Sequence, residues 1–319
     1  MSKHQPSRPV IVAAALLALV SACASSSPQL AATADPEVTM DSLVTAEWLS
    51  EHLDHPDLVV FDCTVTLEQT EEGMRAVSGR AAYEAGHIPG AGFADLTDEL
   101  ADGDNPQKYA LPTPEEFARV MGELGVGDDS MVVLYDSSMS AWAARVWWML
   151  RWIGFDRAAL LDGGLGAWKA AGLPLSTETP VRSPKKLTPA PRWDLVADRD
   201  EVLAAISDEN VQLVDAMPAA HYRGEMTMYA RPGHIPSAVN VPVTSLVDDS
   251  GRYLPVDELS SLLDLDRETR AITYCGGGIA ASSDAFIMTR LGYTDVAVYI
   301  SSLQEWAADP ENPMVVETP

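Results

Sequence analysis

Cysteine and basic side chains are both scarce in this chain of 319 residues. Its three cysteines, Cys23, Cys63 and Cys275, are too few for a disulfide-rich scaffold. None of them lies in a CxxC pair or beside histidines with metal-ligand spacing. Lys and Arg number 21 against 47 Asp and Glu, a formal charge of −26, and such a surface repels phosphate backbones. We therefore expect no metal, no other cofactor and no nucleic-acid partner.

Long apolar runs are missing as well. The apolar stretch Val10–Val20 is shorter than the roughly 20 residues that span a bilayer as a helix. Lys3 and Arg8 precede it and small residues follow, as in an export signal. The sequence Val20-Ser21-Ala22-Cys23 resembles the lipobox of bacterial lipoproteins, in which the cysteine is lipidated. We expect an exported protein of the cell envelope, held at a membrane by a lipid on Cys23; an ordinary secretory signal that contains a cysteine is the alternative.

The rest of the chain contains two segments that resemble each other. Each has a Gly-His-Ile-Pro motif, then an apolar run that ends in tyrosine, then a glycine–aromatic pair and a tryptophan. The first copy of these features lies at Gly86–Pro89, Tyr135, Gly154-Phe155 and Trp168, and the second at Gly233–Pro236, Tyr274, Gly292-Tyr293 and Trp306. The nearly constant offset over the later features predicts a duplicated domain rather than a small-repeat solenoid.

Proline marks the boundary between the copies. Residues 176–192 contain four prolines and little apolar content, which predicts a semi-stiff linker. The expected organisation is a signal peptide over 1–22, a flexible tether over 23–38, a first domain over 39–175, the linker over 176–192 and a second domain over 193–316.

Inside each copy, short apolar runs alternate with amphipathic stretches. Strands are expected over residues 58–61, 131–135, 211–214, 271–274 and 296–300. Helices are expected over residues 114–124, 141–152, 256–263 and 280–291, and Gly292 is expected just past the end of the last one. This alternation predicts an α/β fold with mostly parallel sheets flanked by helices on both faces. Ligands then bind at the carboxyl ends of the strands.

Cys275 lies at such a strand end. Gly276, Gly277 and Gly278 follow it, and Ile279 and Ala280 lead into a helix. Three consecutive glycines permit positive φ and a tight curl, so several main-chain N–H groups can point at one spot. The positive end of the helix dipole adds to them. We expect Cys275 to be a thiolate near neutral pH and a nucleophile, whereas Cys63, which has no such loop, is expected to be a core residue.

Three sets of residues together resemble the tandem-domain rhodanese family. They are the loop Tyr274–Ala281, the two Gly-His-Ile-Pro segments and Ser302–Trp306 near the end, and the resemblance covers nearly all of residues 39–316. The family contains thiosulfate and 3-mercaptopyruvate sulfurtransferases. The resemblance implies two rhodanese-like domains and a ping-pong reaction. Cys275 takes a sulfane sulfur from a donor, becomes a persulfide and passes the sulfur to cyanide or a thiol.

The resemblance also assigns roles to other positions. Asp136 stands in the first copy where Cys275 stands in the second, which implies a catalytically silent first domain that walls the cleft. His87 and His234, in the Gly-His-Ile-Pro turns, are expected to be structural.

Substrate binding is implied for a stretch of the second domain. Arg223 matches the arginine–glycine step of mercaptopyruvate enzymes, Arg231 is a looser match, and His221 stands where the family usually has arginine. Either arginine is expected to hold a carboxylate or a thiosulfate oxyanion; an exposed arginine without a ligand is the alternative.

The donor and the reaction class stay open at this point. The loop lacks the basic residues of thiosulfate enzymes, and Gly277 replaces the serine of mercaptopyruvate enzymes; we favour thiosulfate narrowly. A cysteine phosphatase of the same fold needs an arginine six residues after the cysteine, where this chain has Ala281. A non-catalytic lipoprotein that carries persulfide or senses redox state is the remaining alternative.

Overall fold

The computed structural model describes residues 38–70 and 73–317. The expected signal peptide and Cys23 lie outside this part of the chain. The residues from Met40 onward form one compact unit. Within the described ranges, no helix is both long enough and apolar enough to span a membrane.

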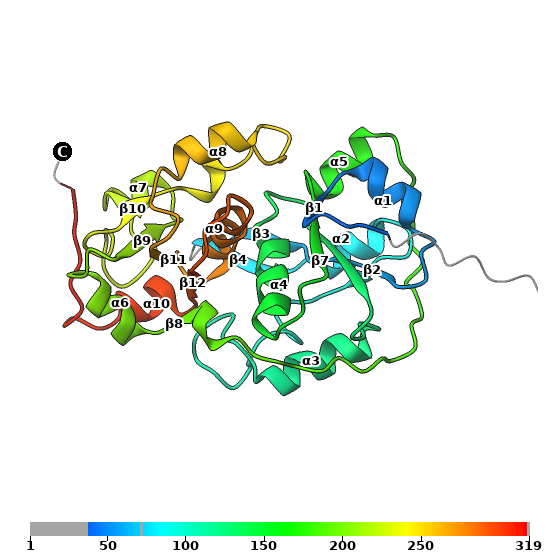
Figure 1. Ribbon diagram of the computed structural model, residues 1–319, viewed down its shortest axis with the longest axis horizontal. Coiled ribbons are helices and arrows are strands. Elements are labelled where there is room, and N and C mark those ends of the chain that lie inside the picture. The colour runs from blue at the N-terminus through cyan, green and yellow to red at the C-terminus, as the bar shows by residue number, and fades with distance from the viewer. Residues whose placement is uncertain (1–37, 71–72, 318–319) are drawn as a thin grey trace, which may run out of the picture. The chain divides into compact units, whose positions relative to one another are not determined.

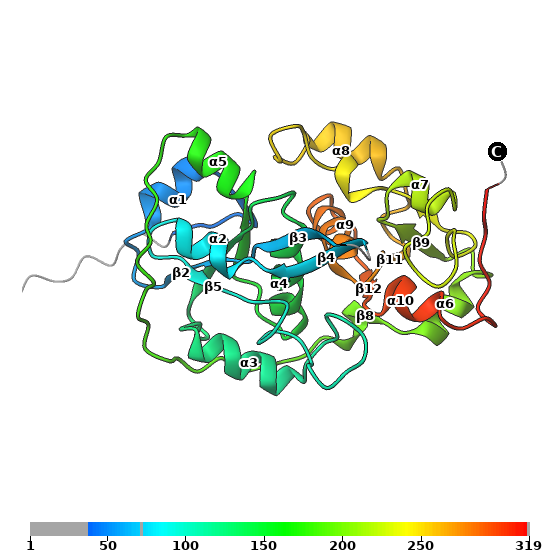
Figure 2. The same cartoon turned by 180° about the vertical axis from the view of Figure 1, so that it is seen from behind.

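The first half contains a five-stranded parallel sheet in the order β1-β7-β6-β2-β5. Its strands are β1 (Leu43–Val44), β2 (Leu58–Asp62), β5 (Gly92–Phe93), β6 (Met131–Tyr135) and β7 (Ala158–Leu161). Helices flank it (Figures 1 and 2). They are α1 (Ala46–His52), α2 (Arg80–Ala85), α3 (Pro114–Glu123), α4 (Ala141–Trp152) and α5 (Gly164–Ala170).

The second half repeats this topology in the order β8-β12-β11-β9-β10, again all parallel. Its strands are β8 (Val196–Ala197), β9 (Val211–Asp215), β10 (Val239–Asn240), β11 (Arg270–Tyr274) and β12 (Val296–Tyr299). Its helices are α6 (Arg199–Ala205), α7 (Ala219–Tyr222), α8 (Val256–Leu262), α9 (Ile279–Arg290) and α10 (Ser302–Trp306). The predicted duplicated α/β fold is confirmed.

The two halves meet through α4 and α9, which lie side by side in Figures 1 and 2. Each helix packs on the central strand of its own sheet and on one neighbour of that strand, α4 on β6 and β7, and α9 on β11 and β12. Trp147 of α4 meets Phe286 of α9 edge to face, with ring centroids 4.8 Å apart. Because α4 follows the Asp136 loop and α9 follows the Cys275 loop, this contact brings the two equivalent loops to one part of the molecule.

Two features of the first half were not anticipated. An antiparallel hairpin, β3 (Val65–Thr70) and β4 (Gly73–Ser78), has no counterpart among the strands of the second half. The proline-rich linker hydrogen-bonds back to the first half: the Ala190 N–H donates to the Ile153 carbonyl and the Arg192 N–H to the Trp152 carbonyl, both at 2.7 Å. The linker therefore runs along the domain that precedes it.

The Gly-His-Ile-Pro turns are built alike in both halves. His87 stacks on Tyr83 with centroids 3.9 Å apart, and His234 stacks on Tyr222 at 3.6 Å. In each case the histidine Nδ1 lies within hydrogen-bond distance of the same tyrosine's carbonyl oxygen, 2.8 and 2.7 Å away. These contacts agree with the interpretation of both histidines as structural residues.

Candidate active site

The loop that follows β11 holds Cys275 at the carboxyl edge of the second sheet. The Cys275 side chain is almost fully buried, with 3% of the residue exposed. Its N–H donates to Ser302 Oγ at 3.1 Å, and its carbonyl accepts from the Leu303 N–H at 3.0 Å. Ser302 itself has φ +49°, a conformation that costs a non-glycine residue energy and that clusters at functional sites. Strained backbone from the start of α10 therefore fixes the base of the loop.

The three glycines of the loop serve different purposes. Gly278 has φ +78° and is the residue from which α9 starts. Gly276 has no positive φ; instead, a Cβ there would overlap the hydroxyl of Tyr229. At Gly277 a Cβ would lie 3.1 Å from Gln304 Nε2, a tight but adjustable contact. The expected curl thus needs one left-handed glycine, not three, and the loop is crowded by side chains from elsewhere.

The main-chain N–H groups of residues 276–281 make no hydrogen bond to any described part of the protein. They include the first N–H groups of α9, which have no acceptor within their own helix. Donors of this kind at the start of a helix suit a bound anion. These N–H groups therefore have no acceptor in the described chain, and the ring of amides around residue 275 stays a prediction.

The first half shows what such a loop can hold. Asp136 occupies the position equivalent to Cys275, and its carboxylate accepts four main-chain N–H groups. The donors are Ser138 at 2.8 Å and Ser140, Trp142 and Ala143 at 3.1 Å each. Ser140, with φ +62°, precedes α4 as Gly278 precedes α9. The Asp136 carboxylate therefore occupies the main-chain N–H groups of the first loop.

Asp136 is fully buried. Burial raises the pKa of its carboxyl group, and the four N–H donors oppose that rise. A carboxylate held in this way cannot accept a sulfur atom, which agrees with a silent first domain.

Several side chains at the loop were not predicted from the sequence. They are Tyr229 over Gly276, Tyr109 and Gln304 beside Gly277, and Arg145 beside Gly278. Tyr109 and Arg145 come from the first domain, so sequence spacing gave no sign of them. One signal was present: Arg145 is a charged residue within the apolar, tryptophan-rich stretch of α4.

A segment of the first domain is clamped to the second beside the loop. Gln304 Oε1 accepts the Lys108 N–H at 3.1 Å, and Gln304 Nε2 donates to the Lys108 carbonyl at 3.0 Å. Ser301 Oγ donates to Gln107 Oε1 at 2.6 Å. A cavity of about 460 Å³ opens next to these contacts, and Cys275 is not among its lining residues. It is lined by residues 105, 107, 110 and 111 of the first domain and by residues 196–200, 299–301 and 305 of the second.

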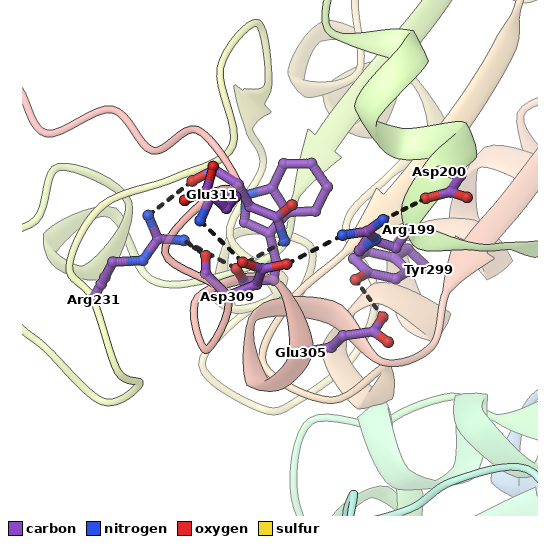
Figure 3. Close-up of polar contacts among 9 residues, drawn as sticks. Arg199, Asp200, Arg231, Tyr299, Glu305, Asp309 and Glu311 are labelled. Atoms are coloured by element: carbon purple, nitrogen blue, oxygen red, sulfur yellow. Dashed lines mark hydrogen bonds and ion pairs between the residues drawn. The ribbon is translucent and has the colours of Figure 1, made fainter.

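Arg231 does not have a free guanidinium for substrate, which corrects the expectation from the sequence. Its Nε, Nη1 and Nη2 donate to four main-chain carbonyls, as Figure 3 shows in part. The acceptors are Ala307 at 2.9 Å, Asn312 at 2.8 Å, Trp306 at 3.0 Å and Asp309 at 2.6 Å. Arginine has five N–H donors, so little is left for a ligand. Arg231 fastens the segment after α10.

Arg223 and His221 remain candidates for binding. Arg223 lies just after α7 and forms a bidentate ion pair with Glu225, at 2.7 and 2.9 Å. This ion pair is on the surface, where such pairs are weak and easily exchanged. His221, in α7, makes no side-chain hydrogen bond within the described ranges. Neither side chain has a buried partner, and substrate binding by Arg223 and His221 stays a prediction from the sequence.

The other cysteines have different positions. Cys63 follows β2, is fully buried and is not disulfide-bonded, and Cys275 is free as well. Burial, together with the charges of Asp62 and Asp136, raises the pKa of the Cys63 thiol well above its usual range. Cys63 is thus an unreactive core residue, as expected. Cys23 lies outside the described residues.

Comparisons with known proteins agree with this arrangement. A rhodanese-like domain is matched twice, over residues 45–171 and 198–309. The chain is 36% identical over 281 residues to a probable 3-mercaptopyruvate sulfurtransferase of Pseudomonas aeruginosa, covering 85% of this chain and 97% of the relative. It is 31% identical to thiosulfate/3-mercaptopyruvate sulfurtransferase 2 of Arabidopsis thaliana, over 92% of both chains.

A solved structure is similar over the same region. The crystal structure of SseA from Escherichia coli, a 3-mercaptopyruvate sulfotransferase, matches with a TM-score of 0.74 and 33% identity. The match covers 82% of this chain and 99% of SseA. The chain therefore belongs to the rhodanese family, as a sulfurtransferase with two rhodanese domains.

Proposed function

We propose that the protein transfers the sulfur of 3-mercaptopyruvate to a thiol or cyanide acceptor through a persulfide on Cys275. The observation that supports this most is the set of unpaired N–H groups over residues 276–281, in the place where the first domain binds a carboxylate. A persulfide anion on Cys275 would extend into that set as the Asp136 carboxylate does. Among the described residues, no carboxylate accepts the N–H groups of residues 276–281.

The first half-reaction balances without a cofactor. The Cys275 thiolate attacks the sulfur of 3-mercaptopyruvate, a sulfur–sulfur bond forms, and the carbon–sulfur bond breaks. The electron pair of the broken carbon–sulfur bond passes to the substrate, which leaves as the enolate of pyruvate. The proton from the substrate thiol then adds to the enolate carbon and gives the methyl group of pyruvate. In the second half-reaction the acceptor attacks the outer sulfur, and the Cys275 thiolate leaves.

Two features favour 3-mercaptopyruvate over the thiosulfate that the sequence alone suggested. Residues 276–281 provide no basic side chain for the second charge of thiosulfate. Two relatives, 36% and 34% identical to this chain, are named after 3-mercaptopyruvate.

The Tyr229 hydroxyl, which lies against Gly276, is available to hydrogen-bond the enolate oxygen, in place of a serine at position 277. Arg223 is the group that we expect to hold the substrate carboxylate.

Thiosulfate is the second candidate donor, because the Arabidopsis relative is named for both donors. Intact-mass measurement separates the two. We expect 3-mercaptopyruvate to add the mass of one sulfur atom to the protein, with release of pyruvate, and thiosulfate to add it more slowly. The Cys275→Ser variant should gain none. If thiosulfate loads faster, the proposed donor is wrong; if neither donor loads, the protein is a non-catalytic member of the family.

We propose further that the mature chain is anchored to a membrane by a lipid on Cys23. The proposal rests on the basic, apolar and small-residue pattern before that cysteine. Expression in a bacterium that processes lipoproteins should place the protein in the membrane fraction and label it with radioactive palmitate. Cys23→Ala should abolish the label; a labelled Cys23→Ala variant would refute the anchor.

A further inference from the structure

Arg145 is a buried cation from the silent domain that lies against the catalytic loop. It is in α4, the helix equivalent to α9, and the residue is fully buried. Its Nη1 is 2.8 Å from where a Cβ on Gly278 would stand. The guanidinium thus lies beside the residue from which α9 starts, three residues after the reactive sulfur.

The guanidinium is only partly satisfied. Nη2 donates to the Tyr109 carbonyl at 2.8 Å, whereas Nε and Nη1 are buried and find no hydrogen-bond acceptor in the described chain. The guanidinium carbon also lies 5.4 Å from the ring of Trp148, a cation–π contact. No Asp or Glu forms an ion pair with Arg145 within the described ranges.

An unpaired buried cation is costly unless an anion offsets it. The chain has 47 acidic residues, yet the charge that acts on Arg145 is that of Cys275. Burial lowers the pKa of Arg145 to about 10, and the Cys275 charge opposes that shift, so the guanidinium keeps its proton at neutral pH. The guanidinium therefore lies against the last glycine of the Cys275 loop, and the charge of Cys275 favours its protonated form.

We propose that Arg145 is the counter-ion of the Cys275 sulfur, supplied by the first domain and stabilising both the thiolate and the persulfide anion. This inference rests on the proposed function, because it assumes that the sulfur is charged during the reaction. It gives the silent domain a chemical task in addition to its structural one. The N–H groups of the loop then orient the anion, and Arg145 provides a full positive charge.

Charge-selective alkylation of Cys275 tests the proposal without any sulfur donor. The thiolate displaces iodide from anionic iodoacetate or from neutral iodoacetamide, and intact mass with peptide mapping follows the product on Cys275. A nearby cation accelerates the anionic reagent selectively. We expect the iodoacetate-to-iodoacetamide rate ratio to exceed that of free glutathione in the wild-type protein. In Arg145→Met the ratio should fall by about tenfold, the size expected for one partly screened charge.

Two further variants identify the cause. Arg145→Lys keeps the charge and should retain most of the ratio. Arg151→Met removes an arginine of the same helix whose partner is Asp156, and it should leave the ratio unchanged. Persulfide formation should slow by about 100-fold in Arg145→Met and by much less in Arg145→Lys.

Each outcome is decisive. A folded Arg145→Met variant with the wild-type ratio overturns the proposal. If Arg145→Met does not fold, a wild-type ratio at or below that of glutathione still overturns the proposal, and a ratio retained in Arg145→Lys supports it. Failure of both sulfur donors to load Cys275, with the charge preference intact, would refute the proposed function but not the pairing of Arg145 with the sulfur.

Discussion

Single residues around Cys275 show why this loop tolerates so little change. Gly278 is needed for its left-handed backbone, and Gly276 for the space that the Tyr229 hydroxyl fills. Ser302 accepts the Cys275 N–H, donates to the Tyr299 carbonyl at 2.6 Å and is held at positive φ. The hydrogen bonds of Ser302 and Leu303 to this segment hold Cys275 in register with the start of α10.

Gly276→Ala should be far more damaging than Gly277→Ala. The new methyl group at 276 collides with Tyr229, whereas at 277 it meets the end of the flexible Gln304 side chain. We expect Gly276→Ala to lower the free energy of unfolding by about 1–3 kcal/mol and to suppress persulfide formation. Urea unfolding and mass-monitored loading measure the two effects. Equal losses in both variants would mean that Tyr229 does not lie where the structure has it.

Asp215, at the end of β9, should make stability depend on pH. Burial raises its pKa to about 6, whereas an unfolded aspartate has a pKa of about 3.9. The folded state therefore binds the Asp215 proton more tightly than the unfolded state does. The stability that this proton contributes is fully present below the unfolded pKa of about 3.9, and it is lost as the pH rises through about 6. We expect a gain of about 1 kcal/mol between about pH 7.5 and about pH 5, absent in Asp215→Asn, by urea unfolding at both pH values. The same pH dependence in Asp215→Asn would assign it to another group.

At the scale of helices and strands, the central elements could be predicted well from the sequence. Strand β6 and helix α4 have the expected bounds, because each is a strongly apolar stretch with clear ends. The hairpin β3–β4 was missed because its residues are mostly exposed and polar, and because apolar and polar residues alternate only weakly along its strands. The residues around the Cys275 loop were only partly predictable, since Tyr109 and Arg145 reach Gly277 and Gly278 from the first domain through tertiary packing.

Asp284 of helix α9 is buried without any polar contact in the described chain that explains its burial. Asp284 is fully buried, and neither carboxylate oxygen has a hydrogen-bond partner in the described chain. Burial, with the charge of Asp215, raises the pKa of Asp284 well above its ordinary value. Replacing an unsatisfied polar group by an apolar one of similar size removes that penalty. Asp284→Val should raise the free energy of unfolding at neutral pH by about 1–3 kcal/mol, measured in urea; a loss of stability would show that Asp284 has a partner, such as a buried water.

At the scale of the whole molecule, the duplication has produced two loops at equivalent positions, each ending in a left-handed residue before its helix, with different contents. In the first loop a carboxylate accepts four N–H groups; in the second, the N–H groups of residues 276–281 have no acceptor among the described residues. The first domain, which we predict to be catalytically silent, contributes Arg145, Tyr109 and the segment bound by Gln304 to the surroundings of the Cys275 loop. Catalysis by the second domain should therefore depend on contact with the first.

Gln304→Ala should weaken that contact while leaving the sulfur in place. The variant loses both hydrogen bonds to Lys108, so the segment over residues 105–111 should become more accessible. We expect faster cleavage there in limited proteolysis and a several-fold fall in kcat/KM, with little change in Tm. Gln69→Ala is a control, because Gln69 is an exposed residue of the β3–β4 hairpin. Unchanged proteolysis would mean that the clamp does not hold the segment.

The position of the outer sulfur in the loaded enzyme tests the central claim most directly. A crystal structure of the protein after treatment with 3-mercaptopyruvate should show a persulfide on Cys275, with the terminal sulfur among the N–H groups of residues 276–281. The arrangement should match that of the Asp136 carboxylate in the first domain. A terminal sulfur turned away from these N–H groups, with the loop donating to water instead, would contradict the account.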